Sequence, residues 1–243
     1  MRWIPLCWLA VSCGVQIEQR SGANPELDPP ADGPASQPDT ARVCSNGRVV
    51  YLNFEGATLT AAAASDATQN RASWMQITSG TAPRYKTVAA DRDQQIQAIV
   101  DGVRGQLSSF PITVVTQRPA AGPYVMIVYG GAYTQVGSRF TGAVNTLDCN
   151  DVQKSDLAWI SDNVSPRQRI VNFSVGAIGF GLGLTATTDP LDCMCGWDNN
   201  CISDNSGPCK LSPTIARDPT ANQRCTDVTT QDEPATFDAA FCK

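Results

Sequence analysis

Residues 170–184 read Ile-Val-Asn-Phe-Ser-Val-Gly-Ala-Ile-Gly-Phe-Gly-Leu-Gly-Leu, and the interpretation of the whole chain depends on this stretch. It is too short and too rich in glycine for a membrane-spanning helix, which needs about 20 apolar residues. Its glycines could be mistaken for a phosphate-binding loop, but no Lys-Ser or Lys-Thr pair follows them and no strand abuts them. The stretch therefore predicts a helix buried in a protein core.

The residues before this helix show the patterns of strands and of one further helix. Runs of apolar, β-branched and aromatic residues predict five strands, at residues 48–54, 112–116, 124–129, 141–146 and 156–161. Apolar residues recur at helical intervals over residues 91–110, which predicts an amphipathic helix. Residues 57–88 are mostly small and polar, so we expect a long surface loop there. This order of elements predicts an α/β sandwich.

The composition suits one folded domain. The chain has 243 residues, of which 42% are hydrophobic and 17% are charged, and this is enough for one sizeable core. Its formal net charge is −5, and its 18 Lys and Arg residues are scattered along the sequence. Proteins that bind a phosphate backbone concentrate positive charge in a patch or stripe. Nucleic acid is therefore not expected as a partner.

The N-terminal residues have the features of an export signal. A positive charge at Arg2 is followed by a short apolar run that ends just before Cys13, the order found in bacterial lipoprotein signals. We expect a signal peptide at residues 1–12 and a lipid on Cys13 that anchors the exported chain to a bacterial membrane. Residues 13–42 are rich in Pro, Ala, Gly, Ser and Asp and predict a disordered tether. A single folded domain is expected over residues 43–243.

With Cys13 assigned to the lipid, eight cysteines remain after the leader: Cys44, Cys149, Cys193, Cys195, Cys201, Cys209, Cys225 and Cys242. Outside the cytoplasm thiols meet an oxidising environment and pair, so this even set predicts disulfides whose connectivity the sequence leaves open. The four cysteines between positions 193 and 209 are also close enough for a zinc knuckle, but they contain no CxxC pair. We favour disulfides.

The buried helix and the residues after it resemble the metzincin motif H-E-x-x-H-x-x-G-x-x-H of zinc metalloproteases. Gly183 falls on the motif glycine, and Leu184 follows it as in the matrixins. Residues 187–194 contain Asp-Pro and end in Met194, at the spacing of the family's Met-turn. The order of the upstream elements extends the resemblance to about residues 45–200. The chain is similar to matrixin-like secreted lipoproteins of the myxobacterial type.

The sequence departs from the motif at the positions that perform the chemistry. Gly176, Phe180 and Ala186 stand where the family has its zinc-binding histidines, and Ala177 stands in place of the glutamate that acts as general base. None of these side chains offers a lone pair to zinc or accepts a proton. The chain contains no histidine at all. The resemblance therefore implies a metalloprotease scaffold whose zinc positions are vacated.

The resemblance implies a zincin-like α/β fold. This fold has a twisted, mixed five-stranded sheet and two long helices at residues 43–186, then the Met-turn and a cysteine-rich part at residues 187–243. It implies a pseudoenzyme that binds no catalytic zinc, and the sequence does not tell whether structural calcium is present. We expect a surface lipoprotein that binds an extended peptide, or an envelope or prey protein, by strand addition.

Other functions stay open at this point. An enzyme could use non-histidine ligands or other chemistry, but the lysines form no Ser-x-x-Lys arrangement for a serine nucleophile. Asp189 and Asp192 could act as a carboxylate pair or bind calcium, although they also suit a plain turn, which we favour. A purely structural envelope lipoprotein shares every feature except the ligand.

Overall fold

The computed structural model describes residues 48–225 and 229–241. The expected signal peptide, the lipidation site Cys13 and the tether at residues 13–42 lie outside these residues, as do Cys44 and Cys242. The described part is a mixed α/β structure with four α-helices. None of its helices is both long enough and apolar enough to cross a membrane.

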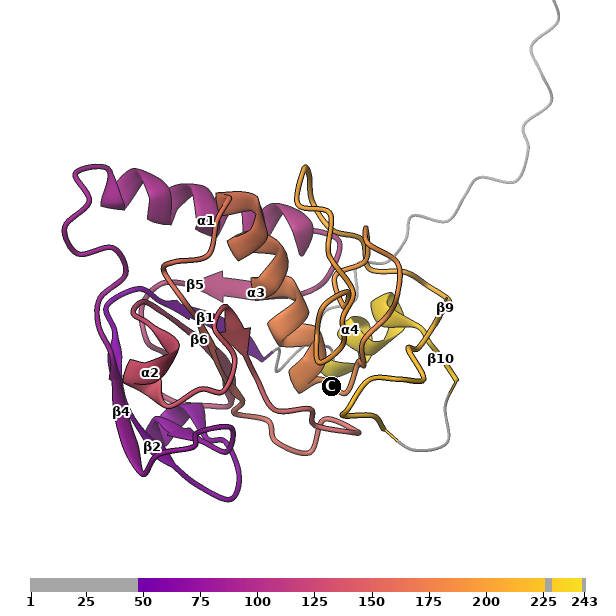
Figure 1. Ribbon diagram of the computed structural model, residues 1–243, viewed down its shortest axis with the longest axis horizontal. Helices are drawn as coiled ribbons and strands as arrows, with labels where there is room; N and C mark the ends of the chain where they lie inside the picture. The colour runs from indigo at the N-terminus through magenta and orange to yellow at the C-terminus, as the bar shows by residue number, and fades with distance from the viewer. Residues whose placement is uncertain (1–47, 226–228, 242–243) are drawn as a thin grey trace, which may run out of the picture. The chain divides into compact units, whose positions relative to one another are not determined.

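A five-stranded sheet forms the centre of this part (Figure 1). In spatial order its strands are β5 (Thr113–Val115), β1 (Val49–Asn53), β6 (Tyr124–Tyr129), β8 (Leu157–Ile160) and β7 (Ala143–Val144). The first four are parallel to their neighbours, whereas β7 is antiparallel to β8. Each strand lies within the range expected from the sequence. The mixed five-stranded sheet is thereby confirmed, and β7 is an edge strand.

Helices cover one face of this sheet. The long helices α1 (Arg92–Gln106) and α3 (Arg167–Gly181) pack against each other, as Figure 1 shows, and the last helix α4 (Glu233–Phe241) joins the same core. Along β6, Val125, Ile127 and Tyr129 point into this core, because successive strand residues face opposite sides of a sheet. The helix expected at residues 91–110 is thus confirmed but ends earlier. The helix expected from residue 170 begins at Arg167.

The opposite face is covered by residues 57–88, and their assignment to a surface loop is wrong. They form a small sheet of β2 (Ala57–Ala61), β3 (Arg71–Ala72) and β4 (Ser79–Ala82), with a short 3-10 helix at Ala67–Gln69. Leu59, Trp74 and Met75 are buried in a second core. They pack there with the β6 side chains that point away from the helices. These apolar residues are few and widely spaced, so no period in the sequence reveals them.

The remaining elements are short. Helix α2 (Tyr133–Val136) packs near β4, and β9 (Ile215–Ala216) pairs with β10 (Thr230–Gln231) ahead of α4. The sequence analysis did not anticipate these elements. With residues 187–212, β9 and β10 belong to the cysteine-rich part of the domain.

Candidate functional site

Helix α3 presents the positions that a zinc motif would use. Gly176, Ala177 and Phe180 are all buried, because this helix is apolar on nearly every side and is enclosed by the core. Pro166 precedes its first turn, where the missing N–H of proline costs no helical hydrogen bond. The helix therefore delivers the expected motif positions into the interior, at the end of the sheet near β7 and β8.

The helix ends in a glycine turn at the expected place. Gly183 has a φ of 90°, a left-handed conformation that favours glycine. Its N–H donates to the carbonyl oxygen of Phe180 at 3.1 Å, and the N–H of Leu184 donates to that of Gly179 at 3.0 Å. This pair of bonds is the Schellman motif, which satisfies the last carbonyls of a helix and reverses the chain. Gly183 thus redirects the chain toward Ala186.

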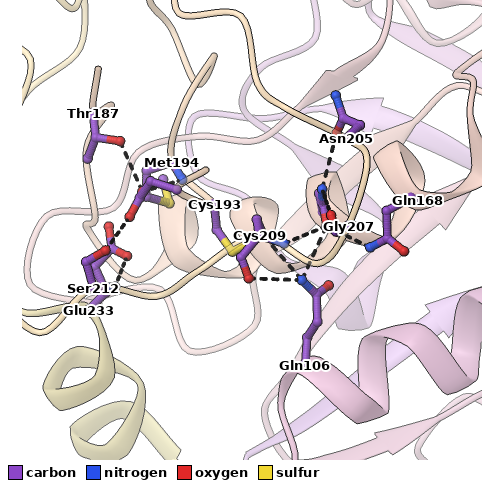
Figure 2. Close-up of a disulfide and its surroundings, with 12 residues drawn as sticks. Gln106, Gln168, Thr187, Cys193, Met194, Asn205, Gly207, Cys209, Ser212 and Glu233 are labelled. Atoms are coloured by element: carbon purple, nitrogen blue, oxygen red, sulfur yellow. Dashed lines mark hydrogen bonds between the residues drawn. A yellow bond between two sulfur atoms is a disulfide. The ribbon is translucent and has the colours of Figure 1, made fainter. Parts of the chain in front are cut away.

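Met194 lies against the same helix. It is fully buried, and its Sδ atom is 2.9 Å from the point that a Cβ atom on Gly179 would occupy. Its N–H donates to Asp192 Oδ1 at 2.9 Å, and the hydroxyl of Thr187 donates to the same oxygen at 3.0 Å. Figure 2 shows Thr187 and Met194 on neighbouring segments of this loop. The buried carboxylate therefore fixes the loop that holds Met194.

The indole of Trp197 fills the space in front of Gly176. A Cβ atom on Gly176 would lie 2.1 Å from Trp197 Nε1 and 2.6 Å from the carbonyl oxygen of Cys193. Real Cβ contacts are never this short, so no side chain fits at position 176 while Trp197 keeps its place. Position 176, where the resemblance would place a zinc-binding histidine, is thus packed against an aromatic ring. The sequence analysis did not single out Trp197.

Phe180 stands beside this indole. Its ring centroid lies 5.4 Å from that of Trp197, and Phe173, one helical turn before Gly176, lies 6.2 Å from Trp197 on another side. Ala186 is fully buried and is followed by Thr187, whose N–H donates to the carbonyl oxygen of Met194 at 3.4 Å. Gly176 and Phe180 therefore meet around one indole, and Ala186 adjoins the Met194 loop.

This arrangement does not suit a zinc ion. Glycine, phenylalanine and alanine side chains carry no ligand atom for it, and the space before Gly176 holds an indole whose nitrogen is a donor only. Among the described residues no three histidine, cysteine, aspartate or glutamate side chains are grouped so that they could hold a metal. Instead, the rings of Phe173, Phe180 and Trp197 form an aromatic cluster, called the aromatic wall below.

A pocket of about 420 Å³ opens beside this wall. Its lining includes the edge strand β7 with the residues just before it, the start of α3, and residues 196–198. The aromatic side chains that line it are Phe140, Phe173, Phe180 and Trp197. A pocket of this size, mostly apolar with a few polar groups, is typical of ligand sites.

Strand β7 lines this pocket and is the last strand of the sheet, so one of its two sides has no neighbouring strand. Gly142 accepts a hydrogen bond from Ser161 N at 2.8 Å, and Val144 is paired with Trp159 of β8. Because hydrogen bonding alternates along an antiparallel strand, the N–H and carbonyl of Ala143 point away from β8. Ala143 is thus available to pair with an added strand.

Disulfides fasten the cysteine-rich part, as expected for six of the eight cysteines. The pairs are Cys149–Cys225, Cys193–Cys209 and Cys195–Cys201. The four cysteines considered as a zinc knuckle are therefore all paired with one another as disulfides. Cys193 and Cys195 flank Met194, and their bonds to Cys209 and Cys201 tie the Met194 loop to the segment that follows it.

A buried amide connects this part to both long helices. Asn172 on α3 accepts from Gln106 of α1 at 3.2 Å and from the N–H of Cys209 at 3.1 Å, and donates to the carbonyl oxygen of Gly207 at 3.1 Å. Figure 2 shows Gln106 and Gly207 beside the Cys193–Cys209 disulfide. One side chain therefore joins three segments that are distant in sequence.

Two buried carboxyl groups meet behind the Met194 loop. Asp192 and Glu233 are 1% and 0% exposed, and Ser212 contacts both, donating its hydroxyl to Asp192 at 2.9 Å and its N–H to Glu233 at 2.9 Å (Figure 2). Burial raises the pKa of Glu233 to about 8, and the charge of Asp192 adds to this shift. Burial likewise raises the pKa of Asp192. Asp189 is exposed and caps a turn that ends at Asp192, whereas Asp192 itself is buried.

A third buried acid lies behind α3. Asp156 accepts from Asn145 Nδ2 at 2.6 Å, and the same amide donates to the carbonyl oxygen of Ala177 at 2.9 Å. Burial raises the pKa of Asp156 to about 6. A Cβ atom on Gly181 would overlap this carboxylate, which explains the glycine there. The group positions the helix and does not face the pocket walls described above.

Comparison with protein-family models finds no match for this chain, and comparison with curated proteins finds none either.

Proposed function

We propose that the protein is an exported, non-catalytic relative of the zinc metalloproteases, anchored by a lipid on Cys13, that binds extended peptide along β7. The three disulfides of the described part support export, since they persist in oxidising compartments. The mixed sheet with two long helices on one face, the glycine turn at Gly183 and the burial of Met194 under α3 support the zincin-like scaffold.

One observation carries the loss of catalysis: the indole of Trp197 stands where a side chain at position 176 would have to be. A histidine introduced there by reversion would collide with it. Apolar packing also avoids the cost of burying imidazoles without a metal, which is a few kcal/mol for each unpaired polar group. The site is thus stabilised in a form without a catalytic ion.

The free edge at Ala143 supports peptide binding. An extended peptide that pairs with β7 would gain main-chain hydrogen bonds and place a side chain in the aromatic pocket, which is how strand addition combines affinity with specificity. A proline at position 143 removes the outward N–H and leaves the pairing of β7 with β8 intact, since proline is tolerated on edge strands.

Proteolysis assays test the first part of the proposal. The purified chain, incubated with casein and with a fluorogenic peptide library, should give no cleavage above a blank, with or without a zinc chelator. Chelator-sensitive cleavage that copurifies with the chain would refute it. For the second part, Ala143→Pro should abolish peptide binding while Ala143→Ser, which keeps the N–H, should preserve it. Equal binding by both variants would exclude strand addition at β7.

A further inference from the structure

The aromatic pocket contains a carboxylate that lacks a full set of partners. Asp198 lines the pocket, its side chain is 3% exposed, and its Oδ2 atom is buried with no hydrogen-bond partner among the residues described. Its other oxygen, Oδ1, accepts from Asn222 Nδ2 at 3.3 Å. Buried polar atoms without a partner are rare in folded proteins and costly to keep. Asp198 is therefore suited to accept a hydrogen bond from a ligand.

Two guanidinium groups already lie over aromatic rings near this carboxylate. The guanidinium of Arg139 lies over the ring of Phe140 at 4.7 Å, and that of Arg169 lies over the ring of Phe173 at 5.0 Å. The faces of aromatic rings carry negative charge density and stabilise cations by about 0.5–1 kcal/mol at exposed sites and more when desolvated. Arg139 also approaches Asp198 Oδ1, but only to 3.9 Å, and its side chain is 55% exposed.

We propose that this pocket takes a lysine or arginine side chain from the extended peptide that pairs with β7. The inference rests on the proposed peptide binding and adds the class of residue that is recognised. The aliphatic stem of the basic side chain would lie between Phe173, Phe180 and Trp197, and its charged end would donate to Asp198. A pocket of about 420 Å³ has room for one such side chain.

An acidic ligand is the competing possibility, because Arg169 lines the same pocket and the buried Nε1 donor of Trp197 also has no partner among the residues described. That nitrogen, however, is directed at Gly176 of α3. Arg169 is exposed, however, so its charge is already solvated and a new ion pair there would gain little. The charge of Asp198 is buried and incompletely paired, so a donor supplied by the ligand gains more. The balance therefore favours a basic side chain.

Selection from a random heptapeptide display library on the immobilised chain tests the inference. We expect the selected peptides to share one Lys or Arg flanked by β-branched residues. Selected peptides without an excess of basic residues would overturn the inference but leave peptide binding in place. Failure to enrich any peptide over Ala143→Pro would overturn both. Enrichment of Asp or Glu would assign the pocket to Arg169 instead and also overturn the inference.

Two variants then assign the interaction to its residues. Asp198 has a φ of 64°, which asparagine tolerates well, so Asp198→Asn should fold normally while losing the charge. It should weaken the best basic peptide about tenfold or more, as expected for one charge-assisted hydrogen bond. Arg169→Gln removes a like charge and should strengthen the same peptide or leave it unchanged. Unchanged affinity in Asp198→Asn, or a loss in Arg169→Gln, would overturn the inference.

Discussion

Replacing Gly176 by alanine tests the packing of α3 against Trp197. In an ordinary helix this change stabilises the fold by about 1 kcal/mol, because glycine is the poorer helix former. Here the added Cβ would lie 2.1 Å from Trp197 Nε1 and 2.6 Å from the carbonyl oxygen of Cys193, so the indole or the loop must move. Overpacking of a core costs about 1–3 kcal/mol or more. We expect a net loss of roughly 1–2 kcal/mol in the free energy of unfolding.

Gly105→Ala on α1 is the matched control, since nothing lies within 4 Å of a Cβ atom there. It should stabilise the chain by a few tenths to about 1 kcal/mol. Both variants are measured by urea unfolding with the disulfides intact. A double variant that also carries Trp197→Ala should show a favourable coupling of about 1 kcal/mol or more between the two sites. The reasoning is refuted if Gly176→Ala stabilises the chain as much as Gly105→Ala does.

Three further predictions concern stability. The folded-state pKa of Glu233 is raised from 4.5 to about 8, so the free energy of unfolding should fall as pH rises from about 5 to 8, by on the order of 2 kcal/mol. Unfolding curves of Glu233→Gln should show a clearly weaker pH dependence of this free energy. An equal slope in the two proteins would contradict the prediction. Asn172→Ala leaves Gln106 and the N–H of Cys209 short of an acceptor, and should cost about 2–4 kcal/mol in urea unfolding, whereas a cost below about 0.5 kcal/mol would contradict the bridging role. Replacing Cys149 and Cys225 together by serine opens a link across a sequence separation of 76, and should cost about 2–5 kcal/mol, measured by thermal unfolding; an unchanged midpoint would contradict it.

Strong local patterns explain what the sequence could predict. The five sheet strands are compact apolar runs, and α1 has a clear helical period, so each was placed within a few residues. The turn at Gly183 was predictable because the conformation that it adopts favours glycine. The buried helix was predicted to within a few residues because a stretch that is apolar on all sides and of that length suits a helix enclosed by a core.

What was missed depends on long-range packing. The small sheet at residues 57–82 is held by isolated apolar residues such as Leu59 and Trp74, whose partners are distant in sequence. Trp197, whose ring packs against Gly176, lies 21 positions after it in the sequence, and no local signal relates the two. The acid pair of Asp192 and Glu233 is separated further still, and only the fold brings it together.

The glycines of α3 illustrate both sides of this comparison. The sequence shows that Gly176, Gly179 and Gly181 weaken the helix, but not why they are present. In the structure each one admits a neighbour: the indole of Trp197, the sulfur of Met194 and the carboxylate of Asp156 respectively. Tertiary contacts therefore replace the helix propensity that these residues lack.

The zinc content of the purified chain tests the central claim most directly. The chain, dialysed against a small excess of zinc and then against metal-free buffer, is analysed for bound metal by mass spectrometry. Since Gly176, Phe180 and Ala186 offer no ligand atom and Trp197 packs against Gly176 and Phe180, we expect far less than one zinc per chain. One tightly held zinc per chain would contradict the account.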